Sequence, residues 1–147
     1  YAAVTEWQDD MQLQAVAKGY ITLPSGRQYH FPGTKWTKWG TATNRTAICN
    51  YPVQGFATGD LLPLALIRLH NMLRENNTQS VICNTVHDSI VMDVYPGEEQ
   101  TAIDLMAEAM LAIKEEAHKR YGIYYDMPID IELKIGDNWL DTELVDL

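Results

Sequence analysis

This sequence has few cysteines, no long apolar run, and one long interval that contains no acidic residue. Its 147 residues contain two cysteines, Cys49 and Cys83, whose separation fits neither a CxxC metal site nor a disulfide framework. We therefore expect two buried thiols in a reducing compartment. No apolar run approaches the roughly 20 residues that span a bilayer, and residues 1–10 lack the basic and apolar pattern of a secretory signal. These absences predict a cytoplasmic chain that has no membrane partner.

The sequence also lacks an initiator Met, and we expect it to be a piece of a longer product. Its length fits about one ordinary domain, and its hydrophobic content of 46% is enough for a core. No internal repeat or low-complexity segment interrupts it.

No Asp or Glu occurs between Asp10 and Asp60, although the whole chain has a net charge of −9. The interval holds five basic residues, namely Lys18, Arg27, Lys35, Lys38 and Arg45. Rings are interleaved with them, including Tyr29, His30, Phe31, Trp36 and Trp39. Cations neutralise phosphates and flat rings lie against sugars or bases, so Lys35 and Lys38 are candidate DNA contacts. A solvated loop that happens to lack acids is an equally open interpretation.

Hydrophobic periodicity and turn residues predict the order of the secondary-structure elements. They are a helix (1–18), a hairpin (19–33), an ordered loop (34–44), a turn-rich segment (50–60), a helix (61–76), a second hairpin (81–94), a helix (96–122), a half-buried strand (129–135) and a tail (136–147). Because βαβ alternation is absent, we expect an α+β fold with helices packed on one face of an antiparallel sheet.

The second hairpin places His87, Asp88 and Ser89 at its turn. Consecutive strand side chains point to opposite faces, so these three cannot converge as a serine-hydrolase triad. At the turn, Asp88 either caps backbone N–H groups locally or projects from the sheet and binds a hard cation such as Mg²⁺. Asp93 lies too far along the second strand to share that cation. A two-metal site for phosphoryl transfer would therefore need a second carboxylate from elsewhere.

Three segments together resemble a known family in order and spacing. They are NYPVQGFATGDLLPLALIRL (50–69), VHDSIVMDV (86–94) and IELKIGDNWL (131–140). They resemble the C-terminal end of family A DNA polymerases, the bacterial polymerase I and phage replicative group, and the segment around Gln54 is closer to the phage members. The resemblance implies an incomplete polymerase palm, with residues 1–17 as the last fingers helix and residues 18–147 as palm with a C-terminal strand and tail.

The same resemblance implies roles for the turn of the second hairpin. Asp88 would bind the catalytic metals, with Mg²⁺ as cofactor, and His87 would lie near the primer end. Family members commonly have Glu at the position of Ser89, so that role is open here, although a hydroxyl can hydrogen-bond a metal-bound water.

Three further residues match family positions that contact DNA. Asn50 and Gln54 correspond to residues that touch the duplex and the templating region from the minor-groove side. The family arginine four residues before Asn50 would fall on Thr46, so Arg45, one residue earlier, is its expected equivalent.

The leading hypothesis is therefore the C-terminal catalytic portion of a template-directed DNA polymerase, with primer-template and deoxynucleoside triphosphates as partners. A first-motif aspartate, a nucleotide-handling fingers helix and a thumb would lie upstream, so the chain alone should be inactive without that portion. The bare sheet edge should pair with the upstream portion or with another copy. Alternatives are a non-catalytic DNA-binding module that retains the palm shape, and a metal nuclease, for which the clustered acids are too few. A phage-encoded protein would act in the host cytoplasm.

Overall fold

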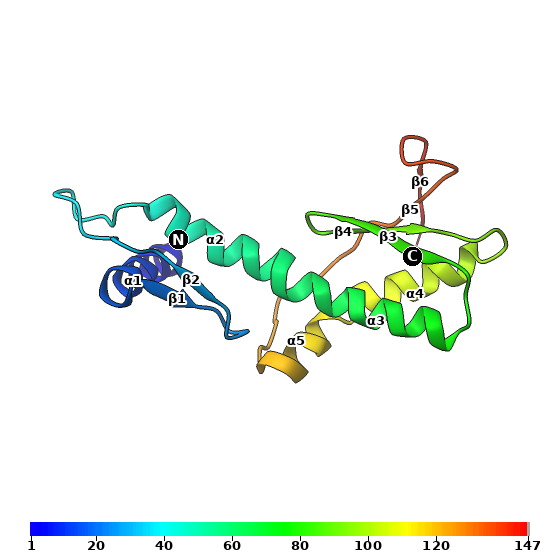
Figure 1. Cartoon of the computed structure of the whole chain (residues 1–147), viewed down its shortest axis with the longest axis horizontal. Coiled ribbons are helices and arrows are strands. Elements are labelled where there is room, and N and C mark those ends of the chain that lie inside the picture. Colours follow the sequence, from blue (N-terminus) through cyan, green and yellow to red (C-terminus); the bar gives the residue numbers. More distant parts are fainter. Residues whose placement is uncertain (147) are drawn as a thin grey trace. The chain divides into compact units, whose positions relative to one another are not determined.

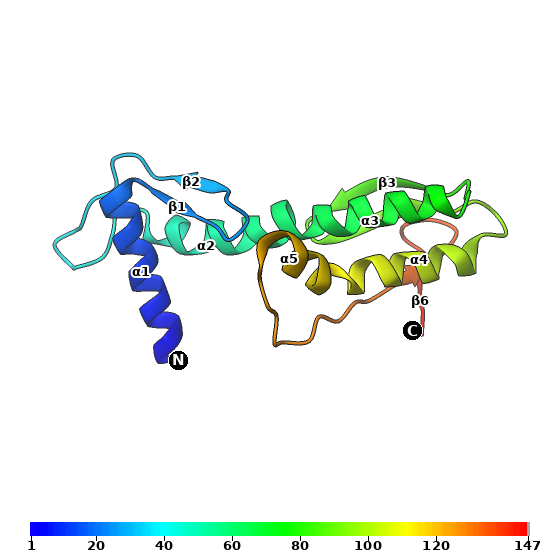
Figure 2. The same ribbon diagram turned by 90° about the horizontal axis from the view of Figure 1, so that it is seen from below.

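The computed structural model describes residues 1–146. They fall into two compact units, Tyr1–Asp60 and a second that begins at Leu61 (Figures 1 and 2). Within the described residues, five α-helices accompany three two-stranded antiparallel sheets. The predicted α+β class is confirmed, and the antiparallel pairing is divided among three separate strand pairs.

The first unit contains the predicted N-terminal helix and hairpin. Its elements are α1 (Ala2–Lys18), β1 (Tyr20–Thr22), β2 (Gln28–His30) and α2 (Arg45–Phe56), followed directly by the π-helical turn η1 (Ala57–Leu61). Helix α1 ends at Gly19, whose φ of 78° lies in the left-handed region that glycine adopts without strain.

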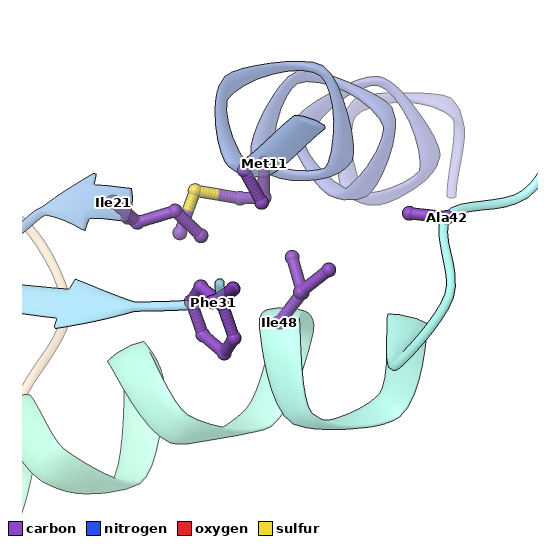
Figure 3. Packing of buried hydrophobic residues seen from close by; sticks show 6 residues of the cluster. Met11, Ile21, Phe31, Ala42 and Ile48 are labelled. Carbon is purple, nitrogen blue, oxygen red and sulfur yellow. The ribbon is translucent and has the colours of Figure 1, made fainter. Parts of the chain in front are cut away.

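One apolar cluster holds these elements together. Met11 and Ala15 of α1, Ile21 of β1, Phe31 after β2 and Ile48 of α2 are all buried and in contact, as Figure 3 shows for the labelled side chains. Removing a large side chain from such a cluster costs about 2–5 kcal/mol, so these residues fix the relative positions of α1, the hairpin and α2.

The segment 50–60 was predicted to be turn-rich, and this prediction is wrong because the segment is helical throughout. Its Pro and Gly residues suggested turns, but α2 buries Ile48, Cys49 and Pro52 on one face, and this packing outweighs the local preference. Gly55 is needed here because a Cβ at that position would collide with the phenol of Tyr29.

The second unit contains the remaining elements. They are α3 (Leu62–Glu75), β3 (Val81–Val86), β4 (Ser89–Asp93), α4 (Glu99–Leu111), α5 (Ile113–Tyr121), β5 (Lys134–Ile135) and β6 (Glu143–Leu144). Three boundaries differ from the prediction. The helix predicted over 96–122 is divided at Ala112, the strand predicted over 129–135 is only two residues long, and the predicted tail supplies its partner β6.

Helices α3 and α4 pack on one face of the β3–β4 hairpin, as predicted (Figures 1 and 2). Their shared cluster comprises Leu69, Leu73, Leu105 and Ala109, with Ile82, Ile90 and Met92 of the hairpin packed against it. On the other side of α3, Arg68 forms ion pairs with Glu108 of α4 at 2.8 Å and Glu116 of α5 at 3.1 Å. The hairpin therefore packs against these helices.

The two ends of the β3–β4 hairpin are joined at its base by Glu98. Its carboxylate accepts hydrogen bonds from the backbone N–H of Gln79 at 2.9 Å, the N–H of Ser80 at 2.9 Å and the hydroxyl of Ser80 at 2.6 Å. The Ser80 oxygen in turn accepts from the N–H of Tyr95 at 3.0 Å. These bonds hold the entry to β3 against the exit from β4.

We expect Glu98→Gln to lower stability at neutral pH and to lose that effect in acid. The Ser80 hydroxyl, followed by the Gln79 N–H, lowers the pKa of Glu98 from its ordinary value because both favour the carboxylate. A lowered folded-state pKa gives stabilisation that is present above the unfolded pKa of about 4.3 and is lost as the pH falls through the folded pKa. Denaturation midpoints of both proteins across this range should converge at low pH. A difference that is constant with pH would contradict the ionic role of Glu98.

The two cysteines differ in environment. Cys49 is buried, and burial raises the pKa of its thiol. Cys83 is exposed, so the prediction of two buried thiols is wrong for this residue. The register of β3 against β4 shifts between Ile82 and Asn84, and Cys83 is the extra residue of that irregularity, which removes it from regular pairing. Among residues 1–146, no helix combines the length and hydrophobicity needed to cross a membrane.

Candidate functional site

The turn of the β3–β4 hairpin places His87 and Asp88 as its two central residues. The last strand pair before it is Val86 with Ser89, which makes this a two-residue turn. His87 has a φ of 55°, in the left-handed region that two-residue hairpin turns require and that L-residues seldom adopt. This conformation costs backbone energy, and such residues are concentrated at functional sites.

The carboxylate of Asp88 is exposed at the tip of this turn and makes no hydrogen bond or ion pair with another described residue. It therefore does not cap the backbone, which was the local interpretation of an aspartate here. The neighbouring Ser89 hydroxyl instead donates to the carbonyl of Val86 at 2.9 Å and closes the turn. Asp88 is left available for a ligand.

Beside β4 lies an open groove with a volume of about 920 Å³. Residues 88–94 and residues 130–139 line it, together with Ile103, Met106 and Met110 of α4. Among the described residues β4 pairs only with β3, so the other edge of β4 is unpaired. Asp88 and strand β4 thus border the groove.

The residues at this turn fit a Mg²⁺ site only in part. Mg²⁺ commonly binds through one or two carboxylates together with waters and substrate phosphates, and Asp88 can supply one such ligand. In the chain as described, no group of three or more His, Cys, Asp or Glu side chains is arranged to hold a metal ion. The expectation that a second carboxylate must come from elsewhere stays a prediction.

In the first unit, α2 carries the other predicted site residues. Asn50 and Gln54 are four residues apart on one helix face, and both are exposed. Arg45 is the first residue of α2 and donates to the side-chain oxygen of Gln8 at 2.7 Å. In the structure Asn50 and Gln54 therefore lie on the same face of α2, whereas Arg45 is hydrogen-bonded to α1.

Lys35 and Lys38 lie in the loop before α2, and both are exposed. The ammonium group of Lys38 is 4.8 Å from the ring centroid of Trp39. Sequence reasoning grouped these lysines with the neighbouring tryptophans, and the structure places a cation and a ring in contact.

One buried interaction was not predicted from the sequence. Asp60 is only 5% exposed and accepts hydrogen bonds from Ser25 at 2.7 Å and from Nε of Arg27 at 2.9 Å. Arg27 also donates to the carbonyl of Gly59 at 3.0 Å, within the π-helical turn. We call Ser25, Arg27 and Asp60 the turn latch, because it joins the β1–β2 turn to η1. One feature of the sequence could have indicated this interaction: Asp60 is the first acidic residue after the acid-free interval.

Comparisons with known proteins agree over nearly the whole chain. The profile of DNA polymerase family A matches residues 1–141. DNA polymerase I of Caldicellulosiruptor bescii is 29% identical over 97% of this chain and 16% of its own length. The DNA polymerase of Bacillus phage SP01 is 36% identical over 63% of this chain and 10% of its own length. The solved POL domain of Pol1 from M. smegmatis, in complex with DNA primer-template and dNTP, matches with a TM-score of 0.67 and 25% identity, over 77% of this chain and 20% of that one.

This chain belongs to DNA polymerase family A, and the resemblance inferred from its motifs is confirmed. It spans 15% of the length of DNA polymerase I from Synechocystis sp. and 16% of that from Caldicellulosiruptor bescii.

Proposed function

We propose that this chain is the C-terminal catalytic portion of a template-directed DNA polymerase, which adds nucleotides to a primer 3′ end. The observation that carries the proposal is the exposed, unengaged Asp88 at a strained two-residue turn, in a chain that belongs to DNA polymerase family A. The M. smegmatis relative was solved with DNA primer-template and dNTP, which supports the same two partners here. Residues 1–17 would then be the last fingers helix and residues 18–147 the palm, and the host cytoplasm remains the expected compartment.

We assign the divalent cation of this reaction to Mg²⁺, with Asp88 as one of its oxygen ligands. When bound, the cation would neutralise charge that develops on the phosphates. Ser89 would support the turn through its bond to Val86 and could also reach a bound water. His87 would lie beside the primer end because it precedes Asp88 in the same turn.

The face of α2 that carries Asn50 and Gln54 would lie along the primer-template duplex. Both side chains offer amide donors and acceptors, which suit the limited pattern of the minor groove. Arg45 at the start of the helix, and Lys35 and Lys38 in the preceding loop, would contact phosphates.

The groove beside β4 would accept an upstream strand that carries the second carboxylate. In the described chain β4 pairs only with β3, and an unpaired strand edge is completed by pairing with another strand. Such a strand would bring its own acid next to Asp88 and complete the metal site.

Mixing the chain with the upstream portion of the polymerase tests this proposal. The 147-residue chain alone should give no primer extension, whereas the mixture should extend a primer in the presence of Mg²⁺. Primer extension by the chain alone would show that catalysis does not need a second carboxylate from the upstream portion. An inactive mixture that nevertheless binds duplex DNA would favour the alternative of a non-catalytic module.

The same groove predicts self-association in the absence of the upstream portion. At high concentration a second copy should pair with the β4 edge, and adding the upstream portion should displace it. Sedimentation velocity over a concentration series measures both effects. A chain that remains monomeric at the highest concentration would contradict the role of this edge.

A further inference from the structure

The loop between β2 and α2 is an ordered hairpin in which hydrogen bonds cross at several levels. The N–H of Thr37 donates to the carbonyl of Thr41 at 2.8 Å, and the hydroxyls of the same two residues are 3.1 Å apart. Below them Trp36 and Ala42 form an isolated β-bridge, and the N–H of Thr43 donates to the carbonyl of Lys35 at 2.9 Å. We call residues 35–43 the tryptophan hairpin.

The base of the tryptophan hairpin is fixed to the core of the first unit. Ala42 is 3% exposed, and its N–H donates to the side-chain oxygen of Gln12 in α1 at 3.0 Å. Gln12 is itself buried. The second arm of the hairpin then leads directly into α2, and Figure 1 shows the loop beyond the N-terminal end of that helix. The tip is therefore held in a defined position relative to the face of Asn50 and Gln54.

The tip displays a ring and a cation to solvent. Trp39 is 78% exposed, although an indole is among the most costly side chains to leave in water. The ammonium of Lys38 lies 4.8 Å from its ring centroid, and Trp36 is also exposed. Two exposed indoles and a lysine on one braced loop are the kind of surface that suits a partner with flat, negatively charged units.

The charged residues around Trp39 indicate which class of molecule would bind there. No acid occurs between Asp10 and Asp60, so Lys35 and Lys38 have no carboxylate neighbours along this stretch of chain. Lysines are depleted from protein–protein interfaces, where burying their charge is costly. A nucleic acid supplies a phosphate for each nucleotide and a flat base for the ring.

We propose that the tryptophan hairpin binds single-stranded DNA, with an unpaired base stacked on Trp39 and the adjacent phosphates held by Lys35 and Lys38. Bases inside an intact duplex are already stacked on each other, so the ring selects a strand that has left the duplex. Because the hydrogen bonds already hold the loop in place, binding loses little conformational entropy. The inference rests on the proposed function, since it extends the DNA surface assigned to α2, and it adds a site for an unpaired template segment.

Binding of an oligo(dT) of about 12 nucleotides to the full chain tests the proposal. Trp39→Ala should weaken this binding by about 5- to 100-fold, the loss expected for one stacked base. Trp39→Phe should retain most of the affinity because it keeps a ring. The oligonucleotide should also quench tryptophan fluorescence in the wild type and much less in the Trp39→Ala variant.

Trp139→Ala is the matched control, because Trp139 is also an exposed indole, at 66%, but is flanked by Asp137 and Asp141. It should bind oligo(dT) like the wild type. Affinity for a blunt duplex should be unchanged by Trp39→Ala, which separates this inference from the proposed duplex contact of Gln54.

Three results would overturn the inference. One is unchanged oligo(dT) affinity in the Trp39→Ala variant, and another is an equal loss in the Trp139→Ala variant. The third is a Trp39→Ala variant that loses affinity only for the upstream polymerase portion, since the ring would then be a protein contact. Primer extension by the mixture, measured in parallel, shows whether the proposed function stands in each case.

Discussion

Asp88→Asn is expected to lower primer extension by the reconstituted polymerase by on the order of 10³-fold, because a metal ligand supplies several kcal/mol of transition-state stabilisation. Asn is as well suited to a turn as Asp, so the β3–β4 hairpin should persist and only the carboxylate charge is lost. The loss should appear mainly in kcat, with affinity for the primer-template nearly unchanged, because Asp88 acts on the reacting phosphates. Single-turnover extension and DNA binding measured on the same preparation separate the two quantities.

Asp104→Asn is the control for this change. Asp104 is an exposed aspartate on α4 that accepts a hydrogen bond from Gln100 at 2.9 Å and does not line the groove beside β4. Its variant should extend primers at the wild-type rate. Equal activity of the Asp88→Asn variant and the wild type would show that the metal role assigned to Asp88 is wrong.

Asp60→Ala is expected to lower the free energy of unfolding by about 2–3 kcal/mol, because it removes a buried carboxylate that accepts hydrogen bonds from Ser25 and Arg27. We expect a loss near the low end of the range for broken buried ion pairs, because Arg27 is half exposed and water can solvate its charge. The change removes the acceptor that joins Ser25 and Arg27 to the π-helical turn η1. Denaturant unfolding of the full chain measures the effect.

Asp10→Ala provides the comparison, since Asp10 is exposed and, among residues 1–146, bonds only to Gln14 on its own helix, at 2.7 Å. Its effect should stay within about 0.5 kcal/mol. A double-mutant cycle of Asp60→Ala with Arg27→Ala should give a coupling of about 1–2 kcal/mol. Additive effects of the two changes would mean that the turn latch does not act as one unit.

The sequence identified elements wherever local preference and tertiary packing agree. The first helix ends at Gly19 as predicted, and the two-residue turn at His87 and Asp88 lies where the two apolar runs meet. It failed where they disagree. Pro and Gly in residues 50–60 suggested turns, but burial of Ile48 and Pro52 keeps that segment helical. The strand predicted over 129–135 alternates correctly in burial, but only its last two residues pair as a strand.

The candidate site shows the same division. Asp88 became a candidate because family motifs and turn chemistry both point to it, and the structure places it at the hairpin turn as predicted. Its metal role stays a prediction. The turn latch was missed because Arg27 and Asp60 are 33 residues apart, and pairing at that separation has no local pattern. The exposure of Cys83 was missed because a β-bulge depends on the register of two strands.

By itself the sequence determined the family, the α+β class, the hairpin turn that carries Asp88 and the acid-free basic interval, since each of these is written in neighbouring residues or in motif spacing. Only the tertiary structure decided that Asp88 makes no bond with another described residue, that β4 borders an open groove, and that Trp39 stands exposed on a braced loop. These features depend on which distant segments come into contact. Burial and hydrogen bonding between such segments are settled by the packing of the whole chain and cannot be inferred from local preference.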